Sequence, residues 1–290
     1  MANMKKFISS YRSIIAESTD DWNVILKEAL ITFKGKQYPN FGQIVIVAGG
    51  PASGKGFVID NLFGISGKRY DVDSLKEDIK RNAVSVLRKS MAAKYNVDES
   101  VFDMATPEDV SIVHQIIRGS KLKKEYENSF FIAARNASEE LKPNLIFDKT
   151  CSSIKDVYEI VGNAIFSGYK PENIHLVWVL NDVETAKRQN AERDRHVDES
   201  LLNSLHKEVA STMKTLFEHI REGQIELDGD IYIAFNKRGE DVTSKKLKSG
   251  NNHFIEDANY FKVKSAGKNN IDIPASMNEK IQMYTPKQSW

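Results

Sequence analysis

The sequence has little cysteine, little excess charge and no long apolar run, and each shortage excludes a class of protein. Cys151 is the single cysteine, so the chain forms no internal disulfide, and we expect a reducing cytoplasm as its location. The formal net charge of +1 gives no reason to expect nucleic acid as a partner. No apolar run approaches the roughly 20 residues of a membrane span, so we expect no membrane partner. The first residues also lack the apolar core of a signal peptide.

What the sequence does contain is enough apolar material for a globular core. Apolar residues make up 41% and charged residues 28% of the 290 positions, which suits one large domain or one domain with appendages. The six histidines are scattered and do not have the spacing of a metal site.

Short apolar runs alternate with segments of helical periodicity, and this alternation predicts an α/β fold. Such strands form a mostly parallel sheet with helices on both faces, a three-layer sandwich. We expect strands at 43–48, 68–72, 144–148, 175–180 and 231–235. We expect helices at 55–63, 74–93, about 121–141, 153–167, 182–193 and 199–222, and a further helix start at 106–109.

Three regions follow from this pattern. Residues 1–40 read as an N-terminal helical extension, which packs on the domain or docks a protein partner. Residues 41–240 contain the alternating core. Residues 241–290 have few large apolar residues and no sustained period, so we expect a loosely attached C-terminal tail.

A glycine-rich loop lies between the first strand of the core and the helix that follows it. Its residues are Gly49, Gly50, Pro51, Ala52, Ser53, Gly54, Lys55 and Gly56, followed by Phe57. Gly49, Gly54 and Lys55 match the first seven positions of the Walker A pattern, and a strand–loop–helix context is what a phosphate-binding P-loop requires. Glycines let several N–H groups converge, the helix N-terminus adds positive potential, and Lys55 adds a charge for the outer phosphates. The sequence therefore predicts a nucleoside triphosphate site in a P-loop NTPase fold.

The loop departs from the Walker pattern at the position after the lysine. The pattern places a Ser or Thr hydroxyl there to hold Mg²⁺, but this chain has Gly56 and then Phe57. Mg²⁺ is therefore expected to be held by water, by phosphate and by a carboxylate.

Acidic residues follow the second predicted strand. Asp71 and Asp73 are two positions apart, and Asp73 also suits the N-cap of helix 74–93. An acid at a strand end beside a P-loop is the group needed to orient and deprotonate an attacking hydroxyl, or to hold Mg²⁺ through water. We assign this role to Asp73, with Asp71 as the alternative. We also expect Asp71 to contact the substrate.

Asp148 ends the strand at 144–148. It matches either the metal-associated acid of a P-loop enzyme or a contact to a substrate hydroxyl, and a carboxylate satisfied by the following turn is the third reading. The sequence leaves these alternatives open.

Arginines gather near residues 188–198, where one helix ends and a short link begins. Arg188, Arg193 and Arg195 stand where small-molecule kinases carry a lid that closes over the triphosphate. We expect Arg193 and Arg195 to stabilise the transferring group and Arg188 to contact the substrate. A solvated helix end is the structural alternative.

With these features in place, the chain resembles the ζ-toxin family of P-loop kinases over roughly residues 43–240. The order and spacing of several segments carry the likeness: Gly49–Gly56, Asp71–Lys76, Leu145–Thr150, Gly168-Tyr169 with strand 174–180, the lid arginines, Asp230–Ile233 and Asn236–Gly239. The loop is also similar to that of adenylate-kinase-like small-molecule kinases. The opening Met4–Ile8 is similar to the openings of many tailed-phage proteins.

The resemblance implies an ATP or GTP donor, Asp73 as the base, Asp148 as a substrate contact and the lid arginines as charge stabilisers. It also implies a UDP-linked amino sugar as the acceptor. Two positions depart from the family: Phe57 replaces the expected hydroxyl region, and Asp148 stands where the family usually has Glu.

The sequence thus predicts a kinase that transfers the γ-phosphate of ATP to a small-molecule hydroxyl. A nucleotide or polynucleotide-end kinase is the second reading, although the near-zero net charge argues against a long nucleic-acid track. The third is a P-loop module that binds nucleotide without turnover and acts through a protein partner. His196, His206 and His219 read as surface or core residues, and Cys151 as a buried, inert thiol.

Overall fold

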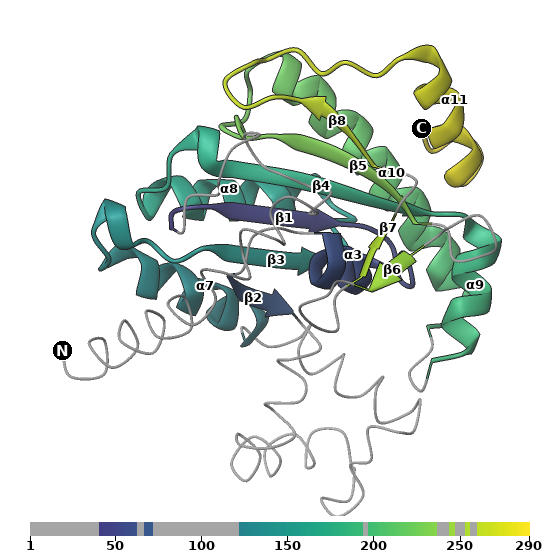
Figure 1. Cartoon of the computed structure of the whole chain (residues 1–290), viewed down its shortest axis with the longest axis horizontal. Coiled ribbons are helices and arrows are strands. Elements are labelled where there is room, and N and C mark those ends of the chain that lie inside the picture. The colour runs from purple at the N-terminus through teal and green to yellow at the C-terminus, as the bar shows by residue number, and fades with distance from the viewer. Residues whose placement is uncertain are drawn as a thin grey trace, which may run out of the picture.

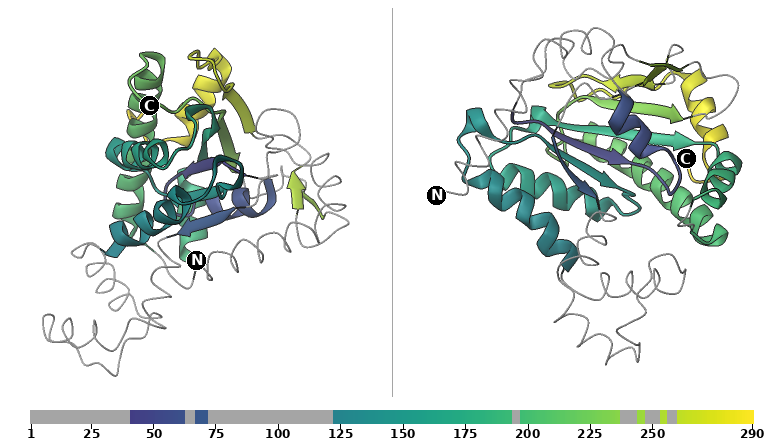
Figure 2. Two further views of the ribbon diagram at one scale, coloured as in Figure 1. Left: turned by 90° about the vertical axis from the view of Figure 1, so that its left-hand side faces the viewer. Right: turned by 60° about the horizontal axis from the view of Figure 1, so that its bottom comes forward.

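The chain is described by a computed structural model (Figures 1 and 2). The described residues are 41–62, 67–71, 122–193, 197–236, 244–246, 253–255 and 260–290. The helices expected within 1–40 and at 74–93, and the helix start expected at 106–109, lie outside these residues.

A six-stranded sheet forms the centre of the domain, in the order β2-β3-β1-β4-β5-β8. The five strands from β2 to β5 are parallel to their neighbours, and β8 joins the edge antiparallel to β5. The strands are β1 (Ile44–Ala48), β2 (Lys68–Asp71), β3 (Leu145–Lys149), β4 (Ile174–Asn181), β5 (Ile231–Asn236) and β8 (Tyr260–Lys264). A separate two-stranded sheet pairs β6 (Ser244–Lys246) with β7 (His253–Ile255).

Helices cover both faces of this sheet. The α-helices are α3 (Lys55–Leu62), α7 (Leu122–Arg135), α8 (Ile154–Phe166), α9 (Val183–Ala191), α10 (Glu199–Arg221) and α11 (Ala275–Tyr284), with short 3-10 turns η1 (Glu139–Leu141) and η2 (Pro171–Asn173). α3 lies on one face, and α7, α8, α10 and α11 lie on the other (Figures 1 and 2). None of the helices in the described part of the chain combines the length and the apolar character needed to cross a bilayer.

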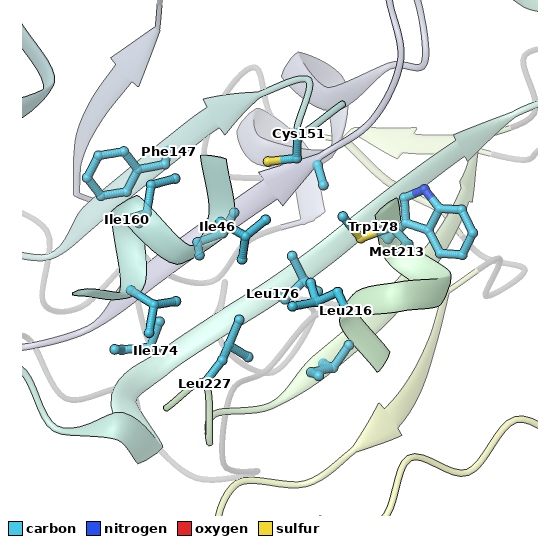
Figure 3. Close-up of a cluster of buried hydrophobic side chains, with 14 of the residues drawn as sticks. Ile46, Phe147, Cys151, Ile160, Ile174, Leu176, Trp178, Met213, Leu216 and Leu227 are labelled. Atoms are coloured by element: carbon cyan, nitrogen blue, oxygen red, sulfur yellow. The ribbon is translucent and has the colours of Figure 1, made fainter. Parts of the chain in front are cut away.

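The core has two halves because successive side chains of a strand point to opposite faces. In β1, Val45 and Val47 join the smaller cluster with α3, while Ile44 and Ile46 join the larger cluster on the opposite face. Figure 3 shows part of the larger cluster, where Trp178 of β4 packs near Met213 of α10. Burial on both faces explains why the central strands read as unbroken apolar runs.

The α/β class and the mostly parallel sheet expected from the sequence are confirmed. The expected strands and helices within the described residues are present, most with boundaries within one or two residues. The clearest difference is α7, which ends at Arg135 rather than near 141, since the chain turns there and forms η1 before Pro143.

The expectation of a loose tail is wrong for residues 260–290. β8 pairs with β5, and Val263, Ile271 and Ile281 are at most 4% exposed in the larger core cluster. Trp290 packs against Trp178, with ring centroids 5.1 Å apart. The sequence of this segment looks polar partly because some of its buried residues are charged. Lys264 is one of them, and its Nζ lies 2.8 Å from Oδ1 of Asp228.

The burial of α11 leads to a stability prediction. Replacing Ile281 by Ala should lower the free energy of unfolding by about 2–4 kcal/mol, because a fully buried side chain is removed and a cavity remains. Urea unfolding followed by tryptophan fluorescence measures the change.

The matched control is Met283→Ala on the same helix, where the side chain is 71% exposed and little change is expected. Equal midpoints for Ile281→Ala and Met283→Ala would mean that α11 does not take part in the cooperative fold.

Candidate active site

The glycine-rich loop joins the carboxyl end of β1 to α3, at the centre of the sheet. Gly54 has a φ of +89°, a conformation that side-chain-bearing residues rarely adopt. A Cβ at Gly54 would also lie 1.8 Å from Nδ2 of Asn236. Ala52, with a φ of 54°, takes a left-handed conformation as well. The loop is therefore tightly curved, and only glycine fits at position 54.

Side chains from three other elements hold successive carbonyls of this loop. Nε2 of His206 on α10 lies 2.9 Å from the Pro51 oxygen and donates to it. Nδ2 of Asn181, at the end of β4, donates to the Ala52 oxygen at 3.0 Å. Nδ2 of Asn236, at the end of β5, donates to the Ser53 oxygen at 3.0 Å. These contacts fix the loop from the protein side.

Holding the carbonyls also orients the amide groups. In a planar trans peptide the N–H points away from the C=O of the same unit. The N–H groups of Ala52 and Gly54 therefore face away from the side chains that bind the neighbouring carbonyls, while the Ser53 N–H closes a turn to the Gly50 oxygen at 3.2 Å. Outward-facing amides next to the N-terminus of α3 are donors suited to an anion.

Lys55 begins α3 and points back across the loop. Its Nζ donates to the Gly49 oxygen at 2.9 Å and to the Gly50 oxygen at 3.2 Å, and lies 4.0 Å from Oδ1 of Asp148. Burial lowers the pKa of Lys55, and the carboxylate of Asp148 opposes that shift. The ammonium group is thus held at the mouth of the loop, where the outer phosphates of a nucleotide would lie.

Two of the predicted acids lie side by side at the carboxyl ends of β2 and β3. Asp71 and Asp148 are register partners in the parallel pair, so they face the same side of the sheet as α3. Asp148 forms an ion pair with Arg69, whose Nη2 donates to its Oδ2. The ion pair with Arg69 was not among the roles considered for Asp148 from the sequence.

Arg69 is the principal residue of this site that sequence reasoning missed. It lies two positions before Asp71 on β2 and therefore faces the same side. Its Nη1 also lies 3.4 Å from Oδ1 of Asp60 on α3. The signal available in the sequence was the spacing Arg69-x-Asp71 on one face of a predicted strand.

Asn181 and Asn236 are further residues that the sequence analysis did not assign to the loop. Asn181 ends β4, which is next to β1, and Asn236 ends β5, which is next to β4. The two residues are register partners. Asn181 Nδ2 also donates to Oε1 of Gln189 at 3.1 Å, which links the loop to α9. The sequence analysis considered only acidic residues at strand ends. Amide side chains at the same positions would have indicated Asn181 and Asn236.

The donor set of the described residues does not fit a Walker-type magnesium site. Carboxylate oxygens suit Mg²⁺, but Asp148 is already paired with Arg69, and Gly56 offers no hydroxyl. A Cβ placed on Gly56 would meet Nη2 of Arg69 at 3.6 Å, so a guanidinium borders the place of the missing ligand. No cluster of three or more acidic, histidine or cysteine ligands occurs among the described residues.

The lid region is described in part. Arg188 on α9 and Arg193 just after α9 are exposed, and Arg193 lies close enough to Lys55 to contribute to lowering its pKa. Asn190 exchanges two hydrogen bonds with Val197, at 2.6 and 2.9 Å, which hold Val197 against the end of α9. Arg195 lies outside the described residues, as does Asp73.

Two residues that the sequence placed away from the chemistry have contrasting outcomes. Cys151 is buried, as expected, and burial raises the pKa of its thiol to about 12, which disfavours the reactive thiolate (Figure 3). His206 is buried as well, but it contacts the loop directly, so reading it as an ordinary core or surface residue was incomplete.

The environment of His206 predicts a pH dependence of stability. Burial lowers its pKa, the hydrogen bond to Pro51 opposes that shift, and the positive charge of Lys55 adds to it. The folded chain therefore keeps His206 neutral at pH values where the unfolded chain, with a pKa near 6.5, binds a proton. The free energy of unfolding should fall as the pH is lowered below about 6.5.

The check is urea unfolding between about pH 7.5 and pH 5.5 for the wild type and His206→Gln, since glutamine can donate to Pro51 without titrating. The wild type should lose more stability on acidification than the variant. Parallel pH curves for the two proteins would show that His206 titrates alike in both states.

Neither a protein-family model nor a curated protein matches the chain. Among solved structures it is similar to the AvrRxo1-ORF1:AvrRxo1-ORF2 complex with ATP, at 13% identity and a TM-score of 0.49, covering 98% of this chain and 72% of that one. The same complex with sulphate ions gives 14% identity and a TM-score of 0.48 over the same shares. A structure of the PezAT chromosomal toxin–antitoxin system of Streptococcus pneumoniae gives 14% identity and a TM-score of 0.45, covering 78% of this chain and 76% of that one. The functional assignment therefore rests on the residues of this chain's own site.

Proposed function

We propose that this chain is a kinase that transfers the γ-phosphate of ATP to a hydroxyl group of a small molecule. The observation that carries the proposal is the loop after β1, whose carbonyls are held by His206, Asn181 and Asn236. A loop fixed in this way presents amide donors and Lys55 to one anion without reorganising, and preorganised donors are what phosphoryl transfer requires.

The protein groups have distinct tasks in this proposal. The loop amides and the N-terminus of α3 bind the phosphates, and Lys55 offsets the charge of the outer ones. Acids at the ends of the neighbouring strands align the acceptor hydroxyl, and one of them accepts its proton. We assign proton transfer to Asp73 on its sequence position after β2, and substrate contacts to Asp71 and Asp148.

The lid residues complete the assignment. Arg193 and Arg195 stabilise charge on the transferring phosphoryl group, and Arg188 contacts the acceptor. Magnesium held through water by Asp73 remains a prediction from the sequence, because the described residues beside Gly56 do not form its site.

The identity of the acceptor is a more specific proposal. The resemblance to the ζ-toxin family favours a nucleotide sugar, with a UDP-linked amino sugar as the first compound to test. A protein partner for residues 1–40 is the corresponding proposal for the extension outside the alternating core.

The first test is ³¹P NMR of the purified protein with ATP, Mg²⁺ and a pool of small metabolites that contains nucleotide sugars. A new phosphomonoester signal is expected with the wild type. It should be absent with Lys55→Ala, because the charge that offsets the outer phosphates is removed.

The matched control is Lys155→Ala, which removes an exposed lysine from the first turn of α8 and should leave the signal unchanged. A signal of full size from Lys55→Ala would refute the site. ATP that is bound but never consumed would instead favour a nucleotide-binding module without turnover.

A second variant separates binding from transfer. Asp73→Asn should bind ATP with an affinity close to that of the wild type, while the rate of transfer falls by about 100-fold or more, because a general base is lost. Calorimetric titration gives the affinity, and single-turnover assays with radiolabelled ATP give the rate.

Asp272→Asn serves as the control, since Asp272 is exposed between β8 and α11. If Asp73→Asn kept the wild-type rate, the base would have to be another group.

A further inference from the structure

The corner of the loop beside Gly56 differs in chemistry from the Walker pattern. In that pattern the residue after the lysine supplies a hydroxyl that holds Mg²⁺ against the phosphates. Here a glycine stands at that position, and the atom that a Cβ would meet is Nη2 of Arg69, at 3.6 Å. The positive charge of a β2 side chain therefore lies beside the position whose hydroxyl would hold the metal ion in that pattern.

Arg69 is held in this corner from two sides. Its Nη2 pairs with Asp148 on β3, and its Nη1 lies 3.4 Å from Asp60 on α3. The Asp148 side chain is only 10% exposed, so this partner is itself fixed by packing. A guanidinium group anchored at one edge by a buried carboxylate keeps a defined orientation for its other donors.

The guanidinium group also has donor capacity to spare. A guanidinium group has five N–H groups. The contacts to Asp60 and Asp148 involve Nη1 and Nη2, while Nε is buried and has no hydrogen-bond partner among the described residues. Its side chain remains 32% exposed, so a ligand at the mouth of the loop can reach it. Planar donors of this kind suit phosphate oxygens.

Lys55 lies next to the same carboxylate, at 4.0 Å from Oδ1 of Asp148. Asp148 thus stands between the P-loop lysine and Arg69, and both cations face the side of the sheet that carries α3. Two positive groups that share one carboxylate therefore lie beside the glycine-rich loop.

From this arrangement we infer that Arg69 binds the phosphates of the nucleotide and takes the place of the hydroxyl-held metal in nucleotide binding. The inference rests on the proposed function, because it specifies how the same site recognises a nucleoside triphosphate. It implies that ATP binds with nearly the same affinity with and without Mg²⁺.

The test is calorimetric titration of the full chain with ATP, once in excess Mg²⁺ and once in EDTA. For the wild type, the two dissociation constants should agree within about threefold. Arg69→Gln should weaken ATP binding in EDTA by about tenfold or more, since a hydrogen-bonded charge is lost. Arg135→Gln is the control, because Arg135 is an exposed arginine on α7, where its guanidinium group lies over the ring of Phe166.

A double variant tests the exchange directly. Gly56→Ser combined with Arg69→Gln supplies the hydroxyl and removes the guanidinium group, so ATP binding should become dependent on Mg²⁺. A Cβ at position 56 has ordinary van der Waals room, which makes this variant compatible with the fold. Circular dichroism establishes that each variant is folded before titration.

The outcomes separate the inference from the function on which it rests. If the wild type binds ATP at least tenfold more tightly in Mg²⁺ than in EDTA, the inference is overturned and the proposed function stands. The same holds if folded Arg69→Gln binds ATP in EDTA as well as the wild type does. If the wild type binds no ATP in either buffer, the proposed function fails, and the inference fails with it.

Discussion

The site depends on the hydrogen bonds that three distant side chains make to the carbonyls of the loop after β1. A curved loop of this kind exposes polar backbone on both sides, and every carbonyl buried against the protein needs a donor. His206, Asn181 and Asn236 supply those donors from three different elements. The shape of the loop is therefore a property of the whole sheet and of α10, and not of the glycine-rich sequence alone.

The same sheet places the charged groups. Because β2 and β3 run parallel to β1, their carboxyl ends lie on the edge where the loop begins. Asp71 and Asp148 lie at that edge on adjacent strands, and Arg69 lies two residues before Asp71 on β2. Burial of β1 on both faces makes this geometry rigid, since none of its residues has room to shift without disturbing one half of the core.

The sequence predicted those features that are local. The loop, its flanking strand and helix, and the acids at strand ends were identified because each is encoded within a few consecutive residues. The partners of the loop carbonyls were missed because Asn181, His206 and Asn236 come from positions more than 120 residues further along the chain. The Arg69–Asp148 pair was also missed because its partners are far apart in the sequence. The residues of β2 and β3 do not by themselves show that these two strands are neighbours in the sheet. Residues 260–290 were misjudged because their apolar side chains are sparse and pack against β4, β5 and α10 rather than against one another.

The packing of Trp290 on Trp178 and Phe217 has a consequence for synthesis in the cell. The central strands emerge from the ribosome long before the segment that covers this part of the core, because more than 110 residues separate the two tryptophans. Until that segment emerges, the aromatic surface on β4 and α10 stays open to solvent and to other chains. A nascent chain stalled before α11 would present this surface to chaperones or aggregate through it, so the emergence of α11 and Trp290 governs when this part of the fold can close.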